Sequence, residues 1–339
     1  MLDKPDIQDN IIADCIKDEY KFRVKQIDFL PIGADLSAAV YKAVDENETT
    51  YFIKLKRNPI DEISVTLPKY LKDQGIIQII EPIPTRSGEL WVNLNDFKMI
   101  LYPFVEGKNG YETNLSERNW CEFGLALKRI HACKVPFKLS KFICREIYSP
   151  KWRKKVIYFL VQITNRSLEK SIEKKSAELI LDKKEIILDL VRRADIHAKT
   201  LLEHPAEFVL CHSDIHAGNI LIGTNESIFI VDWDNPIMAL KERDLMSIGG
   251  GLFGSWRTSQ EEENLFYHCY GPTRIDPVAL AYYRYERIIQ DIAVECEQIF
   301  LSKGGMDDCE QTFQYLKSNF LPHNTIEIAY KSDKILRIG

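Results

Sequence analysis

Hydrophobic and polar positions change their spacing about a third of the way along this 339-residue chain. Up to residue 104, short apolar runs alternate with polar positions and turn residues, as in β-strands. Beyond Gly107, apolar residues recur every three or four positions over long segments, as in amphipathic helices. The pattern predicts an α+β protein, with a small β-rich unit over residues 1–104 and a larger, mostly helical unit over residues 105–339.

The first unit is predicted to contain helical segments at 7–20 and 60–74 and strands at 22–31, 38–44, 50–56, 90–94 and 97–103. Pro68 lies within the second helical segment and should kink or restart it, because proline offers no backbone N–H. The loop at 31–37 is a candidate phosphate-covering turn. It holds one glycine, Gly33, and a lone glycine in a hairpin is more often a turn residue.

The second unit is predicted to contain helices at 116–132 and 283–301, and two more across 150–203 divided by a polar patch at 164–175. Ser116 is placed to cap the first of these helices, with Asn119 nearby.

Residues 208–236 carry two polar clusters at the ends of apolar runs. The run at 209–211 leads into the sequence His-Ser-Asp at 212–214, and the run at 228–231 leads into Asp232. Asn219 precedes a third apolar run. Carboxylates and an amide held at strand ends are the groups that metal-assisted phosphoryl transfer requires.

Two other interpretations of these clusters are less favoured. Asp214 and Asp232 could be turn residues, since aspartate is common in turns, but two such loops with this spacing argue against that. His212 and His216 could bind zinc, but no cysteine or third histidine lies at ligand spacing. We expect these histidines to brace the loop through backbone hydrogen bonds.

Composition narrows the possible classes of protein. The chain has 45 Lys and Arg against 50 Asp and Glu, a formal net charge of −5, which argues against nucleic-acid binding. No apolar run approaches membrane-spanning length, and the N-terminal residues do not resemble a secretory signal. The eight cysteines form no CxxC pair, which argues against a disulfide framework. We expect a cytoplasmic protein that binds neither nucleic acid nor membrane.

The sequence HSDIHAGN at 212–219, followed by VDWD at 231–234, resembles the aminoglycoside phosphotransferase family, which has a two-lobed protein-kinase-like fold. The resemblance extends over nearly the whole chain. It is strongest to members that phosphorylate spectinomycin, through the segments YFIKLK at 51–56, EIYSPKWR at 146–153, KERDLMSIGGG at 241–251 and RYERIIQDIA at 284–293.

The resemblance implies an ATP- and Mg²⁺-dependent kinase that acts on an alcohol group. Asp214 matches the catalytic aspartate, and Asn219 and Asp232 match the Mg²⁺ ligands. Lys54 matches the lysine that contacts the α- and β-phosphates, although its strand pattern alone suggests a solvated face. Glu62 is the candidate for the acidic partner of that lysine.

The resemblance also implies the remaining nucleotide contacts. Residues 102–107 match the adenine-binding hinge, where Pro103 can offer its carbonyl and Val105 its N–H. Ser37 and nearby backbone amides are candidates for phosphate contacts, although the loop at 33–37 lacks the family's repeated glycines.

The implied acceptor is a cationic small molecule such as spectinomycin or a similar aminocyclitol, with antibiotic resistance as the result. Choline, homoserine or a methylthioribose-like sugar is the alternative acceptor, and a catalytically inactive binding protein is a further alternative. Asp244 is expected to brace the catalytic loop. Candidate acceptor contacts are Asp214, Asp234, Glu242, Trp256, Tyr270, Tyr282 and Tyr283, with core packing the better interpretation for each aromatic residue.

Overall fold

The computed structural model describes residues 4–31, 38–57, 61–165, 171–204, 207–301, 306–322 and 324–335. The chain forms two compact units, the first made of residues 1–143 and 218–236 and the second of residues 144–217 and 237–339. The lobe boundary expected at residue 104 stays a prediction. By packing, the first unit also takes in residues 105–143 and a segment from the middle of the chain.

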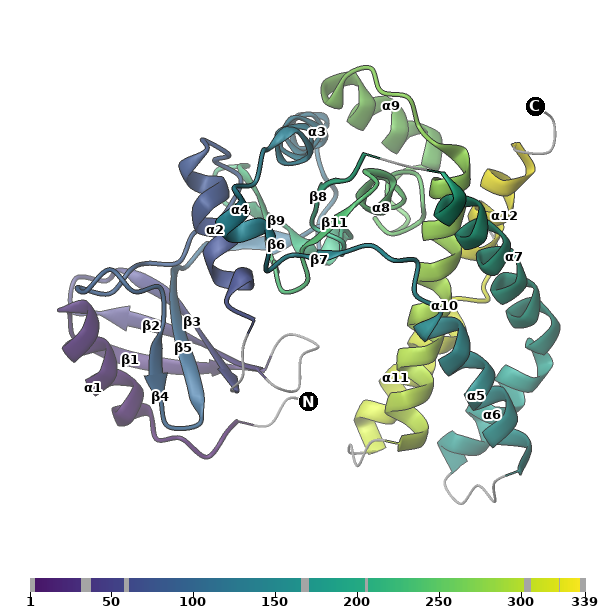
Figure 1. The fold of residues 1–339 in the computed structure, drawn as a ribbon. Helices are drawn as coiled ribbons and strands as arrows, with labels where there is room; N and C mark the ends of the chain where they lie inside the picture. Colours follow the sequence, from purple (N-terminus) through teal and green to yellow (C-terminus); the bar gives the residue numbers. More distant parts are fainter. Residues whose placement is uncertain are drawn as a thin grey trace. The chain divides into compact units, whose positions relative to one another are not determined.

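An antiparallel five-stranded sheet in the order β1-β2-β3-β5-β4 is the main feature of unit 1. Helix α1 covers one face of this sheet (Figure 1) with the buried residues Ile12 and Ile16. On β3, Ile53 and Leu55 point into that core, so Lys54 and Lys56 lie on the opposite face. These elements are α1 (Asp9–Tyr20), β1 (Val24–Leu30), β2 (Ala38–Asp45), β3 (Thr50–Arg57), β4 (Val92–Leu94) and β5 (Phe97–Pro103).

Helix α2 (Ile63–Asp73) runs through Pro68 without ending there. The restart predicted there is therefore wrong. Pro68 is a buried residue on the packed side of the helix, beside Leu67 and Leu71.

A second, three-stranded sheet in unit 1 joins β6 (Gly107–Asn109), β9 (Ile220–Gly223) and β10 (Ile228–Ile230) in the order β10-β9-β6. Gly107 is required for this pairing, since a Cβ there would lie 2.2 Å from the carbonyl oxygen of Ile222. The N–H of Ile230 also donates to the carbonyl of Gln78 at 2.9 Å. These bonds explain why residues 218–236 pack with the N-terminal part of the chain.

Helix α3 (Glu117–Ala132) of unit 1 begins as the sequence predicts. The Ser116 side chain accepts from the Asn119 N–H, and the Asn119 side chain accepts from the Ser116 N–H, which forms a reciprocal capping box. A short helix, α4 (Phe137–Ser140), follows.

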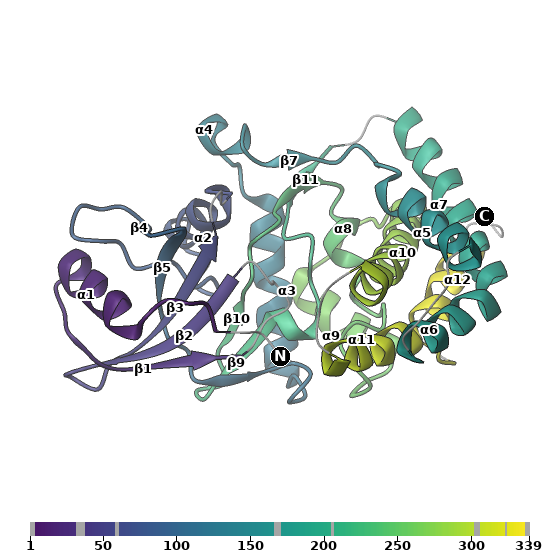
Figure 2. The same ribbon diagram turned by 90° about the horizontal axis from the view of Figure 1, so that it is seen from below.

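Unit 2 is built around the 25-residue helix α10 (Pro277–Leu301), which packs against α5, α7, α11 and α12 (Figure 2). It starts six residues before the predicted helix, because Asp276 caps it by accepting from the N–H groups of Val278 and Ala279. The neighbouring helices are α5 (Lys151–Asn165), α6 (Ser171–Asp182), α7 (Lys184–Glu203), α11 (Met306–Ser318) and α12 (Thr325–Ile335).

The described residues between 150 and 203 form three helices rather than the two predicted. The additional break falls at Lys183, where α6 ends and α7 begins, with no glycine or proline to mark it in the sequence. The described part of unit 2 also contains a three-stranded sheet in the order β7-β11-β8 and two further helices. They are β7 (Cys144–Arg145), β8 (Val209–Cys211), β11 (Ile237–Ala239), α8 (Glu242–Leu245) and α9 (Ser259–Tyr270).

Candidate functional site

The predicted site residues that the structure describes fall into two groups, one in each unit. In unit 1, the β9–β10 hairpin brings Asn219 and Asp232 to the same end of two paired strands. Ile220 lies opposite Ile230, so the residues that flank this pair are also neighbours. The N–H of Val231 donates to the carbonyl of Asn219 at 3.0 Å.

Asp232 has a left-handed backbone, with φ of 65°, and a side chain that is 47% exposed. A non-glycine residue in this region is uncommon, and such residues concentrate at functional sites. Asn219 is buried at the end of the one-turn 3-10 helix η1 (Ala217–Asn219). An amide oxygen and a carboxylate are hard oxygen donors of the kind that Mg²⁺ prefers, so the chemistry of this pair fits the predicted metal.

Lys54 lies beside the same hairpin. Its Nζ is 3.4 Å from a carboxylate oxygen of Asp232 and 3.1 Å from one of Asp234. Asp234 also pairs with Lys56 at 2.8 Å. Burial alone would lower the pKa of Lys54, but Asp234 and then Asp232 outweigh it and raise that pKa, so Lys54 carries a positive charge.

The predicted pair between Lys54 and Glu62 is not formed among the described residues. Glu62 lies at the start of α2, where it is 60% exposed and accepts a hydrogen bond from Lys98 at 3.2 Å. The acidic partners of Lys54 are the two aspartates of the D-W-D sequence, Asp232 and Asp234, and not the acid at the start of the helix. Sequence reasoning missed Asp234 in this role, and missed Lys56 as its second partner.

The predicted adenine hinge runs from the end of β5 into β6. Pro103 is exposed, and Val105 is half-buried between the two strands. The Val105 side chain lies 3.6 Å from the position that a Cβ on Gly223 would take. Ser37 and the candidate phosphate loop at 33–37 lie outside the described residues.

In unit 2, the loop after β8 holds Asp214. The carboxylate of Asp244 accepts the N–H groups of His212 at 2.9 Å and Ser213 at 2.7 Å. Ser213 has a left-handed backbone, with φ of 73°, which these two bonds hold in place. The prediction that Asp244 braces the loop is confirmed.

His212 also supports this loop. The N–H of Asp214 donates to its Nδ1 at 3.3 Å, so the expected backbone hydrogen bond of a bracing histidine is present.

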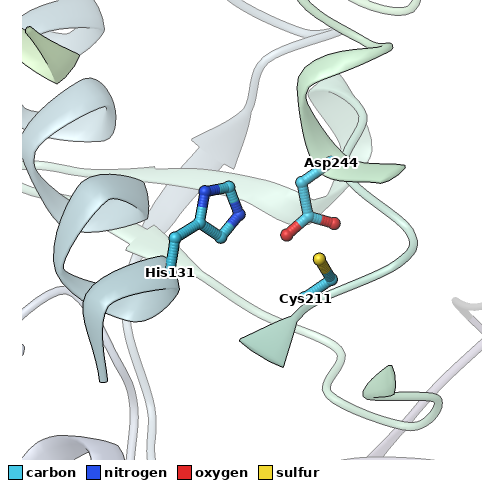
Figure 3. Close-up of side chains that lie close together, drawn as sticks. All are labelled: His131, Cys211 and Asp244. Atoms are coloured by element: carbon cyan, nitrogen blue, oxygen red, sulfur yellow. The ribbon is translucent and has the colours of Figure 1, made fainter. Parts of the chain in front are cut away.

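Figure 3 shows the thiol of Cys211 next to the Asp244 carboxylate. Burial raises the pKa of Cys211 well above its ordinary value, and its thiol lies 3.5 Å from the carbonyl of Leu240.

The carboxylate of Asp214 accepts a hydrogen bond from the guanidinium of Arg287 on α10 and lies 3.8 Å from Nε2 of His216. Burial would raise the pKa of Asp214, but the charges of Arg287, His216 and His212 outweigh it and lower that pKa to about 2. Burial lowers the pKa of His216 to about 4, although Asp214 opposes this. At neutral pH the carboxylate is therefore ionised and the imidazole is neutral.

Arg287 was missed by the sequence reasoning. The available signal was the spacing of Arg287 and Asp291, four residues apart beside the apolar stripe of α10.

Most of the candidate acceptor contacts are core residues. Less than one-twentieth of the residue surface is exposed at Glu242, Tyr270, Tyr282 and Tyr283. Trp256, in contrast, is half exposed.

A sequence model described as the phosphotransferase enzyme family matches residues 28–261, more than two-thirds of the chain. The chain belongs to this phosphotransferase family. A comparison with curated proteins finds no match. Among solved structures, a spectinomycin phosphotransferase in complex with ADP and spectinomycin is 39% identical, with a TM-score of 0.90. The similarity covers 98% of this chain and 100% of that one.

More distant phosphotransferases share the fold alone. An aminoglycoside phosphotransferase from Alicyclobacillus acidocaldarius is 13% identical, with a TM-score of 0.63 over 99% of this chain and 98% of that one. An ethanolamine kinase from Plasmodium vivax is 16% identical, with a TM-score of 0.54 over 90% and 83%. The predicted two-lobed α+β kinase-like fold is confirmed.

Of the helices in the described part of this phosphotransferase, none has the length and apolarity needed to cross a membrane.

Proposed function

We propose that this phosphotransferase transfers the γ-phosphoryl group of Mg·ATP to a hydroxyl group of spectinomycin or a closely similar aminocyclitol. The observation that carries the proposal is the 39% identity, over essentially the full length of both chains, to a spectinomycin phosphotransferase bound to ADP and spectinomycin. The distant relatives support the fold only, so they favour no second acceptor.

In this proposal Asp214 accepts a hydrogen bond from the acceptor hydroxyl and orients its oxygen toward the γ-phosphorus. A carboxylate with a pKa of about 2 is a weak base. It therefore serves mainly to position the nucleophile, in keeping with a loose transition state that requires little early proton removal.

Unit 1 provides the nucleotide and metal contacts. Lys54 binds the α- and β-phosphates with its charged ammonium group, while Pro103 and Val105 contact the adenine. Asn219 and Asp232 hold Mg²⁺, which when bound neutralises charge on the phosphates. We place the enzyme in the cytoplasm, where ATP is available, and expect spectinomycin resistance in cells that express it.

The test is ADP release by the purified protein with Mg·ATP and a panel of acceptors: spectinomycin, an aminoglycoside, choline, homoserine and methylthioribose. We expect acceptor-dependent turnover with spectinomycin. Turnover of choline, homoserine or the sugar alone would contradict the acceptor. Nucleotide binding without turnover of any acceptor would favour the inactive binding protein.

A further inference from the structure

Arg287 joins the candidate catalytic loop to the longest helix of unit 2. Its guanidinium donates through Nη1 to Asp214 and through Nε to Asp291, at 3.0 Å from one carboxylate oxygen. The other Asp291 oxygen lies 2.9 Å from Nε. The Arg287 side chain is 18% exposed, so solvent screens these pairs only partly.

Contacts other than the one with Asp214 also hold the guanidinium in place. Arg287 and Asp291 lie four residues apart and therefore on the same side of α10. The adjoining side of the helix is anchored in the core by Ile288 and Ile292. A planar guanidinium held by one carboxylate can direct a second carboxylate with little further loss of side-chain entropy.

The backbone and the side chain of Asp214 are fixed by different residues. Asp244 binds the N–H groups of the two preceding residues, and His212 accepts from the Asp214 N–H, so both act on the backbone. Rotation of the carboxylate itself is restrained by the bond from Arg287. That carboxylate must point correctly for a hydroxyl to be aligned.

We propose that Arg287 is a positioning residue for phosphoryl transfer, which holds the carboxylate of Asp214 in the orientation that receives the acceptor hydroxyl. This inference rests on the proposed function. Asp291 supports Arg287 from behind, so the three side chains act as a unit in the order Asp291, Arg287, Asp214.

The same contact sets the charge of Asp214. Among the described residues, the ionisable groups around this carboxylate include Arg287 on α10, with Asp291 behind it, and His212 and His216 on the loop itself. Burial favours the protonated carboxyl, and Arg287 is the largest influence opposing burial. Removal of the guanidinium should therefore raise the pKa of Asp214.

The experiment compares Arg287→Met, Arg287→Lys and a control on the same helix, Glu297→Gln, which alters a partly exposed pair with Lys155. We expect Arg287→Met to lower kcat for spectinomycin about 10²-fold. It should leave the Kd of Mg·ATP nearly unchanged and move the acidic limb of the kcat/KM profile to higher pH. Arg287→Lys should restore part of kcat, and Glu297→Gln should behave as wild type.

Unchanged kcat in Arg287→Met would overturn the proposal. So would a loss of kcat that follows a lowered Tm, with no shift of the pH profile and no rescue by lysine. If the wild type turns over no acceptor, the proposed function fails but Arg287 can still be tested. Carboxyl-carbon NMR should then show Asp214 titrating at higher pH in Arg287→Met than in wild type, and identical titration would overturn the contact.

Discussion

The ammonium of Lys54 lies 3.1 Å from the carboxylate of Asp234, which also binds Lys56 at 2.8 Å. The D-W-D sequence therefore places two different carboxylates beside Lys54. Asp232 is the candidate metal ligand, and Asp234 holds the lysine on β3. The helix acid that the family resemblance suggested, Glu62, pairs with Lys98 instead.

This arrangement predicts different effects for two conservative acid-to-amide changes. Asp234→Asn should weaken the orientation of Lys54 and lower kcat/KM for ATP by roughly 10–10²-fold. Glu62→Gln should lower kcat/KM for ATP less than about threefold, because Glu62 forms an exposed pair with Lys98. Steady-state kinetics at varied ATP checks both. Equal losses in the two variants would show that Glu62 supports Lys54 after all.

Asp214→Ala should remove transfer while leaving the nucleotide bound. We expect kcat to fall at least about 10²-fold, the loss expected when the nucleophile is no longer positioned. The Kd of Mg·ATP, measured by equilibrium titration, should stay close to wild type, because the residues proposed to bind it are in unit 1. Substantial residual activity would exclude the role given to Asp214.

Asp244→Ala should destabilise the protein and impair catalysis together. The change leaves the buried N–H groups of His212 and Ser213 without their carboxylate acceptor. Each lost partner should lower the free energy of unfolding by about 1–3 kcal/mol. The matched control is Ser247→Ala, which removes one hydrogen bond to the Asp244 carbonyl and should cost about 1 kcal/mol. Urea unfolding measures both, and similar costs in the two variants would refute the bracing role.

The buried imidazole of His216 should make the folded protein less stable at acidic pH. Its pKa is about 4 in the folded protein, below the value of about 6.5 expected in the unfolded chain. Between these values the unfolded state binds more protons, so the free energy of unfolding should fall as pH drops from 6.5 toward 4.

The full effect is at most about 3 kcal/mol. His216→Gln should flatten this part of the stability curve, whereas His204→Gln, at an exposed histidine, should not. Unfolding measured across this pH range makes the comparison. Curves of the same slope for wild type and His216→Gln would contradict the burial of a neutral imidazole.

The sequence predicted the features that local rules determine. The assignment of alternate residues at 51–56 to opposite faces indicated β3, and the pairing of Ser116 with Asn119 indicated the start of α3. The carboxylates and amide at the ends of apolar runs indicated the two candidate loops. These signals depend on neighbouring residues, so they can be recognised without the fold.

Other features depend on contacts between distant segments. Lys54 and Asp234 are separated by 180 positions, and Asp214 and Arg287 by 73. No local pattern distinguishes Asp234 from Glu62 as the partner of Lys54, since both are acidic residues near a predicted site. The break at Lys183 was missed for another reason, because no glycine or proline marks it.

The central claim is that spectinomycin is the phosphoryl acceptor, and the mass of the product tests it most directly. Wild-type protein, Mg·ATP and spectinomycin should give spectinomycin heavier by one phosphoryl group, with one ADP formed for each product molecule. Asp214→Ala should give none. Spectinomycin recovered unmodified, under conditions where the protein binds ATP and phosphorylates another alcohol, would contradict the account.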